Sequence, residues 1–146
     1  MVQARHAPEA PVGTLAAGDG PALAAAEHLL FAFAPAARLV ASRWPVDQIW
    51  RANQGDMPED RPLALEPRGA RLLVHRDGEG DVAWFRLARA DFALLRALHA
   101  GDTLGRALCF ARAAEPAFDP LPLLRALIQA EVLLDAVLLM PLERIR

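Results

Sequence analysis

The chain has 146 residues, a formal net charge of −2 and 54% hydrophobic residues. This length is enough for one domain with its own core, and the charge excludes the overall positive field that draws proteins to nucleic acid. No apolar run reaches the roughly 20 residues of a transmembrane helix, and the N-terminus lacks the pattern of a secretory signal peptide. We therefore expect a cytoplasmic protein with no membrane partner.

The first part of the chain divides into a linker-like segment and an Ala-rich segment. Residues 1–21 contain three prolines and three glycines, a composition typical of flexible linkers. From Ala22 to Ala34 the high helix propensity and the turn-spaced apolar residues predict a helix. Ala36–Ser42 is expected to add another helical turn. We interpret residues 22–56 as a helical clamp that packs onto the rest of the chain.

Two of the three tryptophans lie in the stretch SRWPVDQIWRANQGD, Ser42–Asp56. Pro45 can open a short helix at its first position, and Gly55 is placed to close it. Trp44 and Trp50 can be core residues, because a buried tryptophan supplies a large contact area. The alternative is a contact surface for a partner protein, where tryptophan is enriched.

A β-hairpin is predicted next. Leu63–Glu66 can form a short first strand, and Arg71–Arg76 and Asp81–Leu87 are rich in residues that suit a pleated surface. Between the latter two, Gly78 and Gly80 can supply the positive φ angles of a tight reversal.

After the hairpin the apolar period becomes helical. A first helix runs through Phe92–His99 and ends at Gly101, the residue type usual just past a helix. Thr103 can act as the N-cap of a second helix. The apolar side of that second helix is formed by Leu104, Ala107, Leu108 and Ala111.

A third helix follows a Pro-containing break. Asp119 and Pro120 resemble an N-cap and first-turn pair, and the apolar spacing carries the helix to about Glu131. Val132–Leu139 is either a last strand or an extension of this helix, and the pattern favours neither.

These elements predict an α+β fold. Three strands followed by three helices over residues 63–139 form a winged-helix-like unit, a small antiparallel sheet with three helices. The N-terminal helices precede it, and we treat residues 22–146 as one domain.

Motifs for catalysis and for metal binding are missing from the sequence. The four histidines are scattered, and no HxxxH, HExxH or CxxC pattern occurs. There is no GxSxG, phosphate-binding loop or dinucleotide fingerprint. Cys109, the only cysteine, sits in an Ala/Leu-rich helix where we expect it to be buried. We expect a protein that is not an enzyme and has no catalytic residue, no metal site and no cofactor.

Three segments together resemble the C-terminal domain of the HvfC/BufC family, whose members were once described as DNA-binding proteins. They are RLVASRWPVDQIWRANQ (Arg38–Gln54), ARLLVHRDGEGDVAWFRL (Ala70–Leu87) and DFALLRALHAGDTLGRAL (Asp91–Leu108). The resemblance covers roughly residues 22–139. It implies an accessory partner of a multinuclear non-haem iron oxidative enzyme that modifies ribosomally synthesised precursor peptides. The implied task is to bind the leader of the precursor peptide and present the peptide to the enzyme.

The resemblance also suggests where such a peptide binds. In peptide-recognition domains of these pathways, an extended leader adds a strand to an open sheet edge and lies against the third helix. Strand alternation places Ala83, Phe85 and Leu87 on the core side. The expected peptide-binding residues are Val82, Trp84 and Arg86 of the strand and Leu124, Arg125 and Ile128 of the helix. Trp44 and Trp50 are the expected contacts to the enzyme.

Two other functions stay open. A winged-helix DNA-binding transcriptional regulator needs basic residues on its recognition helix, but the third helix offers Arg125 and the second Arg106 and Arg112. These are few for neutralising several phosphates, so nucleic acid is disfavoured as a partner. A dimerisation module is the other alternative, with Val132–Met140 as the interface of a homodimer.

Overall fold

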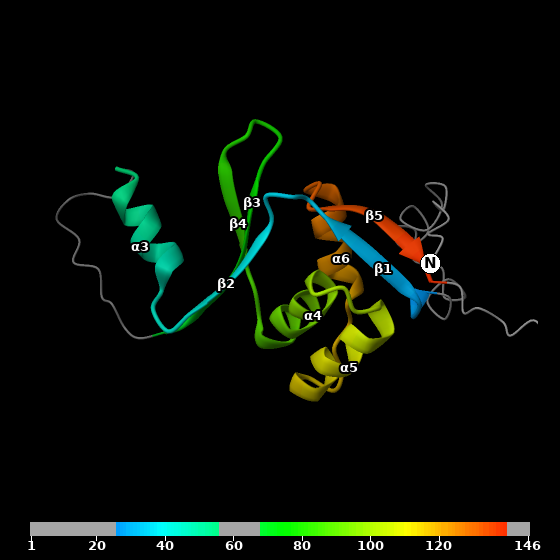
Figure 1. Cartoon of the computed structure of the whole chain (residues 1–146). Helices are drawn as coiled ribbons and strands as arrows, with labels where there is room; N and C mark the ends of the chain where they lie inside the picture. The colour runs from blue at the N-terminus through cyan, green and yellow to red at the C-terminus, as the bar shows by residue number, and fades with distance from the viewer. Residues whose placement is uncertain (1–25, 56–67, 140–146) are drawn as a thin grey trace, which may run out of the picture.

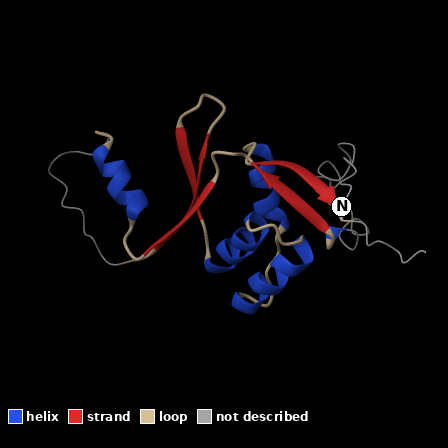
Figure 2. Cartoon of the chain, in the orientation of Figure 1, coloured by secondary structure: helices blue, strands red, loops and turns tan. Residues whose placement is uncertain are grey.

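The structure is a computed structural model of the chain, and it describes residues 26–55 and 68–139 (Figure 1). Helices and short antiparallel strands alternate in an α+β fold (Figure 2), so the predicted fold class is confirmed. In chain order the elements are β1 (Leu29–Phe33), β2 (Arg38–Ser42), α3 (Val46–Asn53), β3 (Ala70–Arg76), β4 (Val82–Arg86), α4 (Arg89–His99), α5 (Leu104–Ala114), α6 (Leu121–Gln129) and β5 (Leu133–Leu138).

The hydrophobic core lies mainly among the C-terminal helices, and the three-stranded sheet adds Leu73 to it. Helices α4 and α5 pack closely together, and the two-stranded sheet β1-β5 contacts all three C-terminal helices. We call α4–α6 with β1 and β5 the helical half. The largest fully buried side chains in it are Leu94, Leu95, Leu98, Leu104, Leu124, Leu127 and Val132. Full burial stabilises each leucine by about 1.5–3 kcal/mol relative to an exposed position.

Local signals in the sequence fix the ends of these helices. Gly101 has φ +98° directly after α4, a conformation that glycine adopts without the steric cost of a Cβ. The Thr103 hydroxyl accepts a hydrogen bond from the Arg106 amide at 3.4 Å, which caps α5 as predicted. The Asp119 carboxylate accepts from the Leu121 amide at 3.0 Å at the start of α6. The predicted apolar side of α5 is also its buried side.

The helices predicted for Ala22–Ala34 and Ala36–Ser42 are wrong. Leu29–Phe33 is the strand β1, and Arg38–Ser42 is the strand β2. β1 is held by antiparallel pairing with β5, which places Leu29 opposite Leu138. Tertiary pairing has therefore overridden the helix propensity of this Ala-rich segment. In its described part the helical clamp of residues 22–56 holds two strands before α3.

The predicted hairpin is confirmed and lies in a three-stranded sheet. Its strands β3 and β4 pair antiparallel, and β2 pairs with the other side of β3, giving the order β2-β3-β4. Gly80 has the positive φ, +88°, of the turn, whereas Gly78 does not. The predicted strand Leu63–Glu66 lies outside the described residues.

The three-stranded sheet and α3 project away from the helical half (Figure 1). We call β2–β4 with α3 the sheet arm. α3 has eight residues and follows Pro45, with Gly55 at φ +78° beyond its end, as the sequence predicted. A helix this short is marginal by itself, so its contacts to the sheet hold it in place.

The structure also decides between strand and helix for Val132–Leu139 and shows the exposure of Cys109. Val132–Leu139 contains a strand rather than a helix extension, because Glu131 at φ +56° turns the chain after α6 and β5 then pairs with β1. Cys109 is exposed, so its predicted burial is wrong: it lies outside the stripe that α5 turns to the core. No helix in the described ranges has the length and apolar content that crossing a bilayer requires.

Candidate functional edge of the three-stranded sheet

β4 offers an unpaired row of backbone groups. The Leu87 amide donates to the Arg71 carbonyl at 2.8 Å, which sets the phase of hydrogen bonding between β3 and β4. Because bonding alternates along antiparallel strands, the amides and carbonyls of Val82, Trp84 and Arg86 point away from β3. Within residues 26–55 and 68–139 no strand pairs with that side of β4. Among the described residues β4 is therefore an open edge, of the kind that can accept another strand.

The side chains of β4 alternate between two faces of the sheet. Leu87 is buried and Phe85 packs against the core, as predicted, while Ala83 is half-buried beside them. We call this the inner face. Val82, Trp84 and Arg86 lie on the opposite, outer face.

Helix α3 covers part of the outer face through aromatic contacts. The rings of Trp50 and Trp84 meet edge to face, with 4.7 Å between centroids. The Arg51 guanidinium lies 5.3 Å from the centroid of Trp84. Each such contact contributes roughly 0.5–1 kcal/mol. Trp84 is therefore held in place beside the edge rather than free to rotate.

An ion pair fixes the other end of α3 to β4. Nη1 of Arg86 donates to Oδ2 of Asp47 at 2.6 Å, and Asp47 is only 4% exposed. Burial by itself raises the pKa of Asp47, but the hydrogen bond and charge of Arg86, with nearby backbone amides, outweigh burial and hold that pKa below its ordinary 3.8. The carboxylate is therefore ionised at neutral pH, and the outer face of β4 is rigidly bound to α3.

Trp44 and Trp50 do not fill the core. They are 44% and 41% exposed, so their interpretation as core residues is wrong and the alternative of an exposed contact surface fits their positions. The Arg43 guanidinium stacks 5.4 Å from the centroid of Trp44. Val40 and Val82 are exposed on the same sheet. The sheet arm thus displays large apolar side chains, as binding surfaces do.

The predicted helix side of the groove is largely buried. Leu124 is 1% exposed, Ile128 packs against the core, and Nε of Arg125 is buried without a hydrogen-bond partner. The main contacts of α6 are with β5, and those of β4 are with β3. The structure therefore does not bring these three residues together with Val82, Trp84 and Arg86. The helix that lies beside β4 is α3, which the sequence reasoning did not place there.

Few basic side chains are available for a DNA-recognition helix. Arg125 of α6 is half-buried, and Arg106 of α5 pairs with Asp102 at 3.4 Å. No group of three or more His, Cys, Asp or Glu side chains is close enough to hold a metal ion in the part of the chain that the structure describes.

The fold and this edge define a class: a small winged-helix-like α+β domain with an edge strand that no other described strand pairs on its outer side. Residues 34–130, about two thirds of the chain, match the family model of the HvfC C-terminal domain. The chain therefore belongs to the HvfC C-terminal domain family. No curated protein and no solved structure matches it. Family membership agrees with the accessory role that the resemblance implied.

Proposed function

We propose that this protein is a non-catalytic accessory protein that binds the leader of a ribosomally synthesised precursor peptide and presents it to a multinuclear non-haem iron oxidative enzyme. The observation that carries the proposal is the open edge of β4 in a domain of the HvfC family. The chemistry belongs to the partner enzyme, and this chain supplies position.

The peptide would bind as an additional strand beside β4. Its amides and carbonyls would pair with those of Val82, Trp84 and Arg86, which point outward. Each such hydrogen bond contributes about 0.5–1.5 kcal/mol net, and side-chain contacts add sequence preference. On the outer face the peptide side chains would meet Trp50 and Arg51, because these residues already lie against Trp84.

The exposed tryptophans suit contact with the enzyme. Trp50 lies in α3 and Trp44 lies between β2 and α3, neither belongs to the core, and each presents a large amphipathic surface. Tryptophan and arginine are the residues that most often dominate binding energy at protein interfaces, and Arg43 stacks beside Trp44. An enzyme that docks here would receive a peptide held on the neighbouring edge.

The test compares two variants, each of which removes one backbone amide that points outward from one edge of the sheet. Val82→Pro deletes a donor of β4 that points away from β3, and proline is tolerated at such edge positions. The matched control is Ala41→Pro, because Ala41 lies on β2 and its amide also points away from β3. The ligand is a labelled synthetic leader peptide encoded beside this chain, and fluorescence anisotropy gives its affinity with and without the enzyme.

We expect Val82→Pro to weaken leader binding at least about tenfold, because the lost hydrogen bond also disturbs the register of the added strand. Ala41→Pro should leave the affinity within about twofold. Absence of leader binding to the unaltered chain, alone and with the enzyme, would reject the proposal. Equal losses in both variants would assign the binding to another surface.

A further inference from the structure

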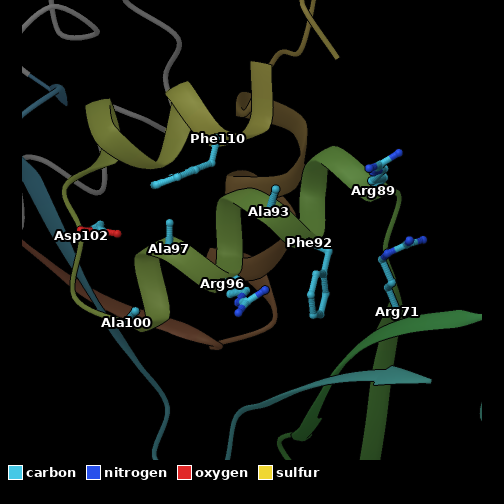
Figure 3. Close-up of a pocket in the computed structure, with 9 residues that line it drawn as sticks. All are labelled: Arg71, Arg89, Phe92, Ala93, Arg96, Ala97, Ala100, Asp102 and Phe110. Carbon is cyan, nitrogen blue, oxygen red and sulfur yellow. The ribbon is translucent and has the colours of Figure 1, made fainter. Parts of the chain in front are cut away.

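A concave surface adjoins the inner-face side of the three-stranded sheet. It is a cavity of about 630 Å³ between α4, α5 and the start of β3 (Figure 3). Its apolar part is made by Phe92 and Ala97 of α4 and by Phe110 of α5. Phe110 is 49% exposed, a large apolar side chain that the fold itself leaves uncovered.

Three arginines line the same cavity. They are Arg71 of β3 and Arg89 and Arg96 of α4, and all three are exposed. Their guanidinium groups form no ion pair or hydrogen bond with any described residue. The guanidinium groups of Arg71 and Arg89 lie at one end of the cavity, and Asp102 lies at the other end (Figure 3).

The acidic group of the cavity does not neutralise these charges. Asp102 is paired with Arg106 of α5 at 3.4 Å. Asp91 is two residues after Arg89 on α4, and its Oδ2 accepts a hydrogen bond from the Ala88 amide at 3.1 Å. Like charges gathered around one concavity repel each other, so an anion between them would be favoured. Guanidinium groups match carboxylates in a two-bond geometry.

The apolar floor narrows the chemistry of the ligand. Inorganic phosphate or a nucleic-acid backbone would satisfy the arginines but leave Phe92 and Phe110 uncovered. A cavity of this size suits one or two apolar side chains with polar groups at its rim. We infer that the cavity is a docking site for an acidic peptide segment of a partner, in which a phenylalanine or leucine is flanked by Asp or Glu.

This site is separate from the edge of β4. Arg71 is two residues before Leu73 on β3, so the two side chains share one face of the sheet. Leu73 is buried in the core, so Arg71 lies on the inner-face side, whereas Trp84 lies on the outer face. The inference therefore does not depend on leader binding at β4, and a partner could occupy both places at once.

The probe is a labelled short peptide with a central Phe-Leu pair and glutamates on both sides. Two further probes are the same peptide with every Glu replaced by Gln and a labelled thymidine oligonucleotide of equal length. Affinities are measured by fluorescence anisotropy on the full chain at low and physiological salt. The variants are Arg96→Gln and Phe110→Ala, with Arg112→Gln as the matched control, because Arg112 is an exposed arginine of α5 outside the cavity.

We expect the Glu peptide to bind at least about tenfold more tightly than the Gln peptide, because charge-assisted hydrogen bonds are the stronger ones. Arg96→Gln and Phe110→Ala should each weaken binding about fivefold or more, and Arg112→Gln should change it less than twofold. Circular dichroism melts confirm that each variant is folded.

Three results would overturn the inference. Equal affinity for the Glu and Gln peptides would mean that the arginines do not select the ligand. Equal losses in Arg96→Gln and Arg112→Gln would mean that only the general charge of the surface acts. If the oligonucleotide binds more tightly than the Glu peptide, and if Arg96→Gln weakens that binding, the cavity is a site for a phosphate backbone.

Discussion

The helical half buries most of its leucines and leaves Phe110 and Leu134 exposed, whereas the sheet arm leaves Val40, Trp44, Trp50 and Val82 exposed. In the helical half, three helices and a strand pair pack around one core. In the sheet arm, one face of the sheet meets the core, and among the described residues the other face meets the short helix α3. The helical half therefore supplies most of the stability of the fold, whereas most of the exposed large apolar side chains lie in the sheet arm.

The family match crosses this division. Residues 34–130 include the whole sheet arm and helices α4–α6, but β1 and β5 lie on either side of the match. The strand pair that closes the helical half is thus outside the matched residues. The arm and the helices that support it are the part of this chain that the family model describes.

The largest effect should come from the core of the helical half. Leu94→Ala removes a fully buried side chain of α4 and should lower the free energy of unfolding by about 3 kcal/mol. Trp50→Ala in the arm should cost about 1 kcal/mol or less, because this side chain is largely exposed. Urea unfolding followed by circular dichroism measures both. Equal losses of unfolding free energy in the two variants would contradict the view that the helical half supplies most of the stability.

The ion pair between α3 and β4 should give a smaller loss. Arg86→Gln leaves the buried Asp47 carboxylate without its charged partner and should cost about 2 kcal/mol. The double variant Asp47→Asn with Arg86→Gln removes the unpaired charge and should recover part of that loss. The check is the same unfolding experiment. A double variant as unstable as the sum of the two single ones would show that the pair is not coupled.

Two glycines with positive φ test whether the halves unfold together. Gly101→Ala after α4 and Gly80→Ala in the hairpin each place a Cβ in a left-handed conformation, at a cost of about 1 kcal/mol. Neither new Cβ meets a heavy atom within 4 Å, so strain in the backbone is the whole cost. If the transition is cooperative, both variants shift the helical signal equally. A shift from Gly101→Ala alone would show that the arm opens independently.

The smallest effect is the dependence of stability on pH. The lowered pKa of Asp47 means that its carboxylate stabilises the folded state above its ordinary value of 3.8, and that this stabilisation is lost as the pH falls through the folded value. The difference in unfolding free energy between the unaltered chain and Asp47→Asn should therefore be constant near neutral pH and shrink in acid below about pH 4. A difference that grows in acid would contradict this sign.

The elements that the sequence predicted are those with local causes. Thr103, Gly101 and the helical spacing around them define α4 and α5 without any distant contact. The hairpin is defined by its own turn residues. By contrast, Leu29–Phe33 has the composition of a helix and forms a strand because it pairs with Leu133–Leu138, about a hundred positions later.

Prediction of the candidate site from the sequence also succeeded only where the cause is local. The alternation along β4 predicted which side chains face the core, and it correctly separated Phe85 and Leu87 from Trp84 and Arg86. It could not reveal that α3 rather than α6 lies beside β4, because that choice depends on contacts between segments distant in sequence, Asp47 with Arg86 and Trp50 with Trp84. The cavity that holds Arg71 and Arg96 was missed for the same reason.

The pairing of β1 with β5 has a further consequence for synthesis and for where the chain enters and leaves the strand pair. Because Leu29 lies opposite Leu138, the two ends of the domain leave it at one corner, while the sheet arm lies toward the opposite end of β1 (Figure 1). During translation β1 stays without its partner strand until β5 has left the ribosome. Once that pair has formed, the chain enters β1 and leaves β5 at the end of the strand pair that is remote from the sheet arm.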